Sequence, residues 1–321
     1  MEDVPFCTHL RYMKKEVKVL VAGSGNVTGM NVIRALFDIK GITLYGCDYD
    51  AVNPSNQWCD SFEVPRCAAE DYPEVIMRII KEKSITHIIA SNDHDVRALS
   101  ILKSNVSNFP FLNGYTQNIL ACLDKKTTEK LFIEAGVETP LEISDNKDYP
   151  YVLRKESMGS NRKFVHIVKN QEDAKAIPEE HYAQGMMTRY VEGEEYTVDM
   201  ICDSYSNVLA AVPRKRIIVM GGMVHHAQIV KEDKLIALCG QISKSVGLVG
   251  MSCIQCITDG EHYNFIEINP RPGSGIDLSI KGGINMPLLW IKDTLGEHVE
   301  VPSPKWGLQM KRYYSGYYFF N

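Results

Sequence analysis

The chain has 321 residues, of which 45% are hydrophobic and 23% charged, and this composition is ordinary for a soluble globular protein with two or three substructures. The formal net charge of −5 and the pI near 6.0 argue against a general nucleic-acid-binding protein, because such proteins concentrate lysine and arginine to neutralise phosphates. No apolar run reaches the roughly 18 residues that a membrane span needs. We therefore expect no nucleic acid and no membrane as a partner, but a small molecule.

Residues 1–16 lack the apolar core of a signal peptide, and we predict that they form a disordered extension. A first domain is predicted over residues 17–112, where strands at 17–22, 42–47 and 85–90 alternate with helices at 31–40, 72–83 and 94–103. This alternation predicts a small parallel α/β layer of the Rossmann-like kind.

A glycine-rich turn joins the first strand of this layer to its first helix. Gly23, Gly25 and Gly29 have the spacing G-x-G-x-x-x-G, and Asp48 follows the second strand about where a ribose-binding acid would lie. Two interpretations stay open from these residues alone. The turn either binds a nicotinamide dinucleotide, or it simply needs small residues.

Two acidic residues follow the strand at 85–90, on the same rim of the layer. Ligands of such domains bind outside the carboxyl ends of the parallel strands, so Asp93 and Asp95 could contact an amine. Alternatively, they cap the next helix, and capping is the interpretation we favour for Asp93.

The second region has a different texture. A helix is predicted at 122–137, ending at Gly136 with Pro140 beyond it, and strands and hairpins dominate from Tyr151 onward. One clear helix is predicted around 233–246. An α/β domain followed by a larger α+β region is the fold class that we predict.

The nine cysteines are odd in number and scattered through apparent core strands, which is typical of reduced thiols and predicts a cytoplasmic protein. Cys253 and Cys256 have C-x-x-C spacing, but no second pair completes a zinc site. An extended strand would also point the two thiols to opposite faces.

The stretch "NFIEINPRPGSG" (264–275) carries the clearest chemistry. Glu267 and Asn269 share one face of a mostly apolar strand, and on the preceding strand Gln255 is the lone polar side chain within residues 253–257. A carboxylate and two amide oxygens suit a hard cation that also binds phosphate oxygens, namely Mg²⁺. The alternative is a solvated strand face that ends in a turn.

From Val17 to about Leu295, the chain resembles the ATP-grasp superfamily through four motifs in order: "LDKKTTEKLFIEAGVETP", "YPYVLRK", "MMTRYVEGEEYTVDM" and "EINPR". The resemblance implies a pre-ATP-grasp domain at 17–112, a linker helix and small lobe at 113–186, and a large lobe with the C-terminal segment at 187–321. It also implies that the nucleotide binds between the two lobes, so the glycine-rich turn becomes the edge of an acceptor-substrate pocket.

The resemblance further implies roles for single residues. It makes ATP and Mg²⁺ the expected cofactors, with Mn²⁺ as an alternative metal, and it assigns Gln255, Glu267 and Asn269 as the metal ligands. Arg271 falls where the family places an arginine against the transferred phosphoryl group. The other residues implied or expected to bind the nucleotide are Lys125 and Arg154 (phosphates), Thr188, Arg189 and Val191 (backbone contacts to adenine), and Glu195 (ribose), with Met186, Met187 and Tyr190 around the base. Arg214 and Arg216 either bind the triphosphate or are solvated charges, and Arg216 is the further catalytic candidate.

One segment departs from the family pattern. Where ATP-grasp proteins commonly carry a mobile glycine-rich loop over the phosphates, residues 155–164 contain only Gly159. Ser160, Arg162 and Lys163 could supply side-chain contacts in place of backbone amides.

The function that the resemblance implies is an ATP-dependent carboxylate–amine ligase, forming a C–N bond through an acyl phosphate, on an amino acid or a small peptide. Its partners would be a small carboxylate and an amine, and a homodimer is left open. The texture is nearest to the carbamoyl-phosphate-synthetase-like branch, although the chain lacks the second arginine that the synthetase carries after N-P-R. Phosphorylation of a small carboxylate in that manner, a non-catalytic ATP-binding regulator and a nicotinamide-dependent dehydrogenase are the alternatives.

Overall fold

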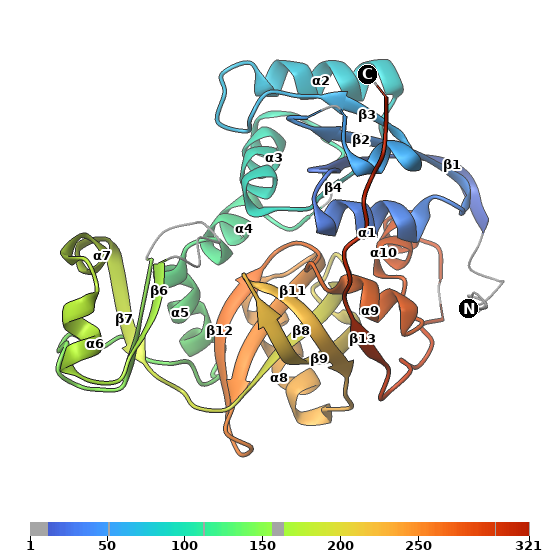
Figure 1. The fold of residues 1–321 in the computed structure, drawn as a ribbon. Coiled ribbons are helices and arrows are strands. Elements are labelled where there is room, and N and C mark those ends of the chain that lie inside the picture. Colours follow the sequence, from blue (N-terminus) through green and yellow to red (C-terminus); the bar gives the residue numbers. More distant parts are fainter. Residues whose placement is uncertain (1–11, 51, 112, 156–163, 299, 321) are drawn as a thin grey trace.

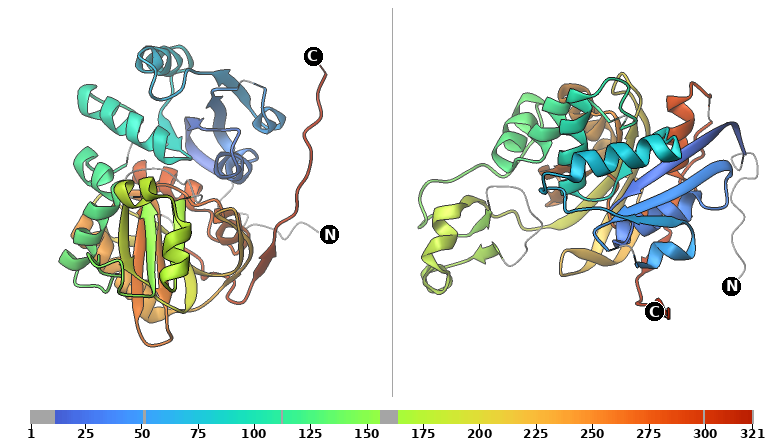
Figure 2. Two further views of the ribbon diagram at one scale, coloured as in Figure 1. Left: turned by 60° about the vertical axis from the view of Figure 1, so that its left-hand side comes forward. Right: turned by 90° about the horizontal axis from the view of Figure 1, so that it is seen from above.

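The computed structural model describes residues 12–50, 52–111, 113–155, 164–298 and 300–320, which form three sheets (Figure 1). A four-stranded sheet has the order β3-β2-β1-β4, a three-stranded sheet the order β6-β5-β7, and a six-stranded sheet the order β12-β11-β8-β9-β10-β13. The small lobe that carries the three-stranded sheet lies at one end of the molecule, and the first domain stands on the large lobe (Figures 1 and 2).

The first domain is the parallel layer that the sequence predicts. Its elements are β1 (Tyr12–Ala22), α1 (Val27–Leu36), β2 (Lys40–Asp48), the short 3-10 helix η2 (Pro54–Gln57), β3 (Asp60–Glu63), α2 (Tyr72–Lys83), β4 (His87–Ala90) and α3 (Asp93–Asn105). All pairings in the sheet are parallel. In β1, Val19 and Val21 pack into one core cluster while Leu20 and Ala22 pack into another, so both faces of the strand are buried, as a parallel sheet requires.

Several boundaries differ from the sequence prediction. The first helix spans 27–36 rather than 31–40, because Asn26 caps it early and β2 already begins at Lys40. The first strand begins at Tyr12, before the predicted start at residue 17, and strand β3 was not predicted. The helix predicted at 122–137 is α5 (Lys125–Glu134), and the helix before it, α4 (Thr116–Cys122), was not predicted.

The small lobe contains β5 (Tyr151–Lys155), β6 (Val165–Val168), α6 (Gln171–Ala176), α7 (Glu179–Gln184) and β7 (Gly185–Arg189). The strands pair antiparallel, with β5 in the middle. A small core of Tyr151, Leu153 and Val168 holds the lobe together, and partly buried residues such as Met187 pack against it.

The large lobe contains β8 (Glu194–Cys202), β9 (Val208–Met220), β10 (Met223–Ile229), α8 (Asp233–Val246), β11 (Gly250–Thr258), β12 (Tyr263–Asn269), α9 (Ile276–Lys281), α10 (Met286–Thr294) and β13 (Gln309–Lys311). Helix α8 confirms the prediction at 233–246. It packs with α5 against one face of the sheet in a core that includes Leu235, Ile242 and Phe265.

The other side of the large lobe is joined to the first domain. Helices α9 and α10 contact α1, and one hydrophobic cluster contains Ile33 and Leu36 of the first domain together with Leu288 and Trp290 of α10. The first domain and the large lobe therefore share a continuous core. Within the described ranges, no helix is both long enough and apolar enough to span a membrane.

Candidate functional site

The oxygen-bearing face predicted on two neighbouring strands is present. In the pairing of β11 with β12, Gln255 lies opposite Glu267, and Cys253 lies opposite Asn269. The register shifts between Gln255 and Cys256, so that Ile266 is an extra residue in β12. This bulge lets Phe265 and Ile268 both reach the core although they are three positions apart in the strand, and it leaves Glu267 and Asn269 on the opposite face.

The two cysteines of the C-x-x-C pattern lie three positions apart in β11, which pairs with β8 without a register shift. Cys256 packs in the core with Ile254, whereas Cys253 lies beside Gly273, close enough that a Cβ on Gly273 would sit 3.2 Å from its Sγ. All the cysteines that the structure describes are free thiols, and burial raises the pKa of Cys253 and of Cys256 to about 12. The two thiols face opposite sides, as the strand pattern predicts.

The donor chemistry of the oxygen-bearing face fits Mg²⁺ when a ligand supplies further oxygens. Among the described residues, no group of three or more His, Cys, Asp or Glu side chains is placed to hold a metal. Gln255, Glu267 and Asn269 offer one carboxylate and two amide oxygens, which is too little negative charge for a self-sufficient cation site. Such a set suits a metal that is shared with phosphate oxygens.

Arg216 connects the oxygen-bearing face to Glu195. Its Nη1 donates to Glu195 Oε1 (2.5 Å) and to Gln255 Oε1 (3.0 Å), and its Nη2 donates to the carbonyl of Gly222 (3.1 Å). The Arg216 side chain is only 4% exposed. Arg216 is therefore a buried charge between the residue expected at the ribose and a residue expected at the metal, rather than a solvated one.

Arg214 has a different environment, although it lies two residues away on the same strand. Its Nε and Nη2 donate to the two carboxylate oxygens of Asp199 at 2.6 and 2.8 Å, and Ser279 Oγ donates to the same carboxylate. The pair is buried, with 2% and 1% of the side chains exposed. Burial alone would lower the pKa of Arg214, but Asp199 more than offsets this and raises it. Because the guanidinium forms a buried ion pair with Asp199, we propose no phosphate contact for Arg214.

Arg154 spans the two lobes. It lies in β5 of the small lobe, and its Nη1 donates to the carbonyl of Ile266, the bulged residue of β12, at 3.1 Å. Its Nε is buried with no hydrogen-bond partner among the described residues. Burial lowers the pKa of Arg154, and the nearby carboxylates of Glu267 and Glu129 oppose that effect. A buried cation with an unused donor next to Glu267 suits an anionic ligand there.

Lys125 is the first residue of α5, and Asp124 caps the helix by accepting a hydrogen bond from the amide of Thr127. The helix begins at this point because the Asp124 side chain satisfies an amide that would otherwise lack a partner. The lysine expected at the nucleotide phosphates therefore lies at a helix N-terminus.

The hinge between the lobes starts where β7 ends. Thr188 is 3% exposed, and the amide of Arg189 donates to Leu141, outside the site. The amide of Val191 donates to no backbone carbonyl in the described part of the chain, which is the state expected of an adenine-binding hinge amide. Met186 and Thr188 share one face of β7, opposite Arg154 and Val152 of β5. Met187 faces the other way, into the core of the small lobe, so the expectation that it lines the adenine slot is wrong.

Arg271 makes contacts that the sequence does not reveal. Its Nε donates to Asp93 Oδ1 (2.6 Å), and its Nη2 donates to Asp93 Oδ2 (3.2 Å) and to Asn269 Oδ1 (3.0 Å). Asp93 was expected to cap α3, but Asn92 does so by accepting a hydrogen bond from the amide of Asp95. The charge of Asp93 is instead used in the ion pair with Arg271. The only sequence signal for this partner was its place at the carboxyl end of a parallel strand.

Asp95 belongs to a separate, buried cluster. Its carboxylate is 5% exposed and accepts hydrogen bonds from Cys67 Sγ (2.9 Å), Asn92 Nδ2 (2.5 Å) and Tyr72 OH (3.4 Å). Burial raises the pKa of Asp95. These contacts give Asp95 a structural role, not the amine contact that was the alternative.

The glycine-rich turn is built for close packing. Gly23 has a φ of +71°, and a Cβ on Gly29 would lie 2.3 Å from the carbonyl oxygen of Gly23. The amides that a phosphate would need are occupied, because Gly29 donates to Asn26 Oδ1 and Gly25 donates to Asp48 Oδ2, each at 3.0 Å. Asp48 therefore closes the turn, and the geometry favours the interpretation without a dinucleotide.

The phosphate lid predicted at 155–164, with Gly159, Ser160, Arg162 and Lys163, falls on residues 156–163, which lie outside the described part.

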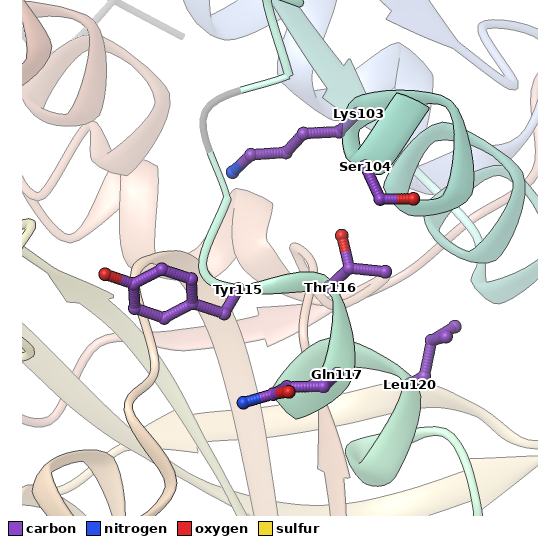
Figure 3. A pocket seen from close by; sticks show the side chains of 6 residues that line it. All are labelled: Lys103, Ser104, Tyr115, Thr116, Gln117 and Leu120. Atoms are coloured by element: carbon purple, nitrogen blue, oxygen red, sulfur yellow. The ribbon is translucent and has the colours of Figure 1, made fainter. Parts of the chain in front are cut away.

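A surface pocket of about 540 Å³ lies beside α3 and α4, and it is lined by Lys103, Ser104, Tyr115, Thr116, Gln117 and Leu120 (Figure 3). The ammonium group of Lys103 already donates to the carbonyls of Asn113 and Gly114.

Two protein-family models match the chain. Residues 181–314 match a family described as ATP-grasp in the biosynthetic pathway with Ter operon, and residues 19–112 match the PylC-like N-terminal domain. Together they match most of the large lobe and of the first domain. Both agree with the family that the four sequence motifs resemble.

Solved ATP-grasp structures have the same fold. The biotin carboxylase domain dimer of 2-oxoglutarate carboxylase from Hydrogenobacter thermophilus, in complex with MgADP, ADP and bicarbonate, aligns with a TM-score of 0.72 at 17% identity, over 89% of this chain and 71% of that chain. The ADP complex of an N5-carboxyaminoimidazole ribonucleotide synthetase gives a TM-score of 0.75 at 16% identity, over 91% of this chain and 80% of that one. An L-amino acid ligase from Bacillus licheniformis gives 0.68 at 15% identity, over 88% and 75%. The predicted fold class, a Rossmann-like domain followed by a two-lobed ATP-grasp domain, is confirmed.

Proposed function

Because the chain is a member of the ATP-grasp superfamily, we propose that it is an ATP-dependent carboxylate–amine ligase that acts on an amino acid or a small peptide. The observation that carries the proposal is the convergence of charges on the oxygen-bearing face of β11 and β12. Glu267 and Asn269 lie there beside Gln255. Three arginines converge on this face: Arg216 donates to Gln255, Arg271 donates to Asn269, and Arg154 donates to the carbonyl of Ile266, next to Glu267.

Two of the structural relatives support the class of reaction. The first holds bicarbonate, a small carboxylate-like acceptor, together with MgADP, and the third is named as an L-amino acid ligase. Their identity to this chain is low, so they support the class of reaction and leave the substrate open. A carboxylate that accepts a phosphoryl group is the feature that such reactions share.

Different residues of this chain would bind the phosphates, the adenine ring, the ribose and the metal. Lys125 and Arg154 would bind the phosphates, while the hinge amide of Val191 would bind the adenine ring. Glu195 is expected at the ribose, although its carboxylate is now paired with Arg216. Gln255, Glu267 and Asn269 would hold Mg²⁺, which when bound supplies positive charge to the phosphate oxygens. Arg271 would stabilise the charge of the phosphoryl group during transfer.

The chemistry is a two-step condensation. An oxygen of the substrate carboxylate attacks the γ-phosphorus of ATP, the bond to the β-phosphate oxygen breaks, and ADP leaves. The amine then attacks the acyl carbon of the resulting acyl phosphate, inorganic phosphate leaves, and the nitrogen loses a proton. Most of the rate enhancement in such transfers comes from positioning and from charge stabilisation.

The proposal is tested by steady-state ADP release with pooled amino acids as the only added carboxylates and amines, followed by mass spectrometry of the products. We expect ADP release that depends on the pool, together with a product whose mass is the sum of two components less one water. ADP release with bicarbonate alone would instead favour phosphorylation of a small carboxylate in the carbamoyl-phosphate-synthetase manner. Mg-ATP binding with no turnover in either mixture would contradict the ligase and favour an ATP-binding regulator.

A further inference from the structure

The segment that follows β12 is held in place by the first domain. Three polar side chains reach it, two from the first domain and one from the residue just after it: Asn31 Nδ2 of α1 donates to the carbonyl of Ser274 (3.2 Å), Asp93 of α3 pairs with Arg271, and Asn113 Nδ2 donates to the carbonyl of Pro270 (3.2 Å). The segment itself has little room to move, because a Cβ on Gly275 would lie 2.4 Å from Nη1 of the buried Arg214. Of the three tethers, only Asp93 acts on a charged side chain.

The hydrogen bonds of Arg271 almost exhaust its donors. A guanidinium has five N–H groups. Nε and one N–H of Nη2 donate to the two oxygens of Asp93, the other N–H of Nη2 donates to Asn269 Oδ1, and one N–H of Nη1 donates to the carbonyl of Pro272 at 3.1 Å. One N–H of Nη1 is left without a partner among the described residues. These hydrogen bonds fix the orientation of the guanidinium and leave one N–H of Nη1 available for a ligand.

The pair between Asp93 and Arg271 is shielded enough to fix this geometry. The side chains are 20% and 16% exposed, and the two hydrogen bonds form a bidentate fork, the arrangement with the greatest directional specificity for an arginine and a carboxylate. Asp93 is also the first residue of α3, a thirteen-residue helix whose dipole favours a negative charge at that end. The carboxylate is therefore stabilised both by the N-terminus of α3 and by its hydrogen bonds with the arginine.

We propose that Asp93 is a positioning residue for the phosphoryl transfer: it fixes the guanidinium of Arg271 so that the remaining Nη1 N–H is presented to the reacting phosphoryl group. The inference deepens the proposed ligase function and rests on it. It assigns the first domain a part in the chemistry although that domain holds no nucleotide. Arg271 would be misaligned without Asp93, because its other contacts, to Asn269 and Pro272, are made with residues next to it in the chain and do not form a fork.

The test is a double-mutant cycle in ADP release with pooled amino acids, using Asp93→Asn and Arg271→Lys. Asp93→Asn keeps the size of the side chain but removes its charge and one acceptor. We expect it to lower kcat by about ten- to a hundredfold with the KM for Mg-ATP unchanged, because misplacement of a catalytic group is felt in the transition state. In the Arg271→Lys background the same change should cost less than about twofold, because Asp93 acts through the arginine.

The matched control is Asp233→Asn, which removes the charge of another aspartate at the first position of a helix, α8, where the side chain is 78% exposed. Its partner Lys231 is exposed and 3.8 Å away, so we expect unchanged kinetics. If Asp93→Asn folds poorly, Asp93→Glu retains the charge across the domain contact, and its kcat should fall because the longer side chain shifts the guanidinium.

The outcomes separate the two proposals. A wild-type chain that releases no ADP overturns the ligase function, and the inference with it. If the wild type turns over, a kcat of Asp93→Asn within twofold of the control, or additive losses in the cycle, overturns the inference alone. A raised KM for the amino acids with unchanged kcat also overturns it, because Asp93 would then bind the substrate amine directly.

Discussion

The charged side chains around the oxygen-bearing face occur in pairs that neutralise one another. Arg216 is paired with Glu195 and Arg271 with Asp93, while Glu267 lies near the cations of Arg154 and Arg271. Burial alone would lower the pKa of Arg271, but Asp93 more than offsets it, so the arginine is charged at every physiological pH. The nucleotide that we propose for this site would therefore meet charges that are already balanced, and Glu267 is the carboxylate that we propose as the metal ligand.

A conservative change at Glu267 tests this assignment. We expect Glu267→Gln to lower both Mg²⁺ affinity and kcat, with partial recovery at high Mg²⁺ concentration, because it replaces the single carboxylate of the set by an amide of the same size. The measurement is the dependence of ADP release on Mg²⁺ concentration. Glu261→Gln in the exposed turn of the same hairpin is the control, and a Glu267→Gln variant that matches it at every Mg²⁺ concentration would remove Glu267 from the metal site.

The sequence predicts which side chains share a face when their residues are close in the chain. Glu267, Asn269 and Arg271 follow one another within a strand and its end, so alternation places the first two on one face. The partner of Arg271 could not be predicted, because Asp93 is 178 residues away and nothing local to either residue specifies the pairing. The same applies to Arg214, whose sequence neighbours do not reveal the buried Asp199.

Among the elements, the first helix and its glycine-rich turn show how a familiar pattern can be explained by packing. Strand, turn and helix were predictable from hydrophobic periodicity, but the purpose of the glycines was not. Their positions are explained by contacts between backbone segments, because Gly29 packs directly against the carbonyl of Gly23. Helix α4 was not predicted at all, and α5 begins three residues later than predicted, because the side chain of Asp124 caps it by accepting from the amide of Thr127.

Two helical glycines give a matched test of this explanation. A Cβ at Gly29 in α1 would meet a backbone oxygen at 2.3 Å, whereas a Cβ at Gly240 in α8 would meet only Val208 Cγ2 at 3.7 Å. We expect Gly29→Ala to lower the free energy of unfolding by about 1–3 kcal/mol through overpacking. Gly240→Ala should raise it by up to about 1 kcal/mol, because alanine is the better helix former. Equal effects in urea denaturation would show that the turn is not closely packed.

At the scale of the whole molecule, the first domain and the large lobe pack against each other through a shared hydrophobic core. The shared core around Trp290 is accompanied by a polar contact, in which His87 of β4 bonds through Nε2 to Thr294 Oγ1 of α10 at 2.8 Å and through Nδ1 to Thr86 Oγ1 at 2.9 Å. His87 is 3% exposed, and burial lowers its pKa from 6.5 to about 4. The folded chain thus holds a neutral imidazole at the contact between its two parts.

This contact predicts a pH dependence of stability. Between about pH 6.5 and pH 4 the unfolded chain binds a proton at His87 that the folded chain does not, so the stability contributed by the neutral ring is complete above pH 6.5 and falls as the pH drops towards 4. We expect the wild type to lose about 2 kcal/mol more than His87→Gln between pH 7 and pH 5. Urea unfolding at the two pH values measures the difference. Parallel pH profiles for the two proteins would mean that His87 titrates normally in the folded state.

We infer that the nucleotide of this chain is ATP, bound between the two ATP-grasp lobes. We also expect the Rossmann-like first domain to bind no dinucleotide. The most direct measurement is the melting temperature with Mg-ATP and, separately, with NAD or NADP at the same concentration, for the wild type and for Glu267→Gln. A ligand that binds only the folded state stabilises it by about 2.7 kcal/mol at a hundred times its Kd. We predict a rise with Mg-ATP that is smaller in Glu267→Gln, and no rise with either dinucleotide. A rise with NAD or NADP and none with Mg-ATP would contradict the account.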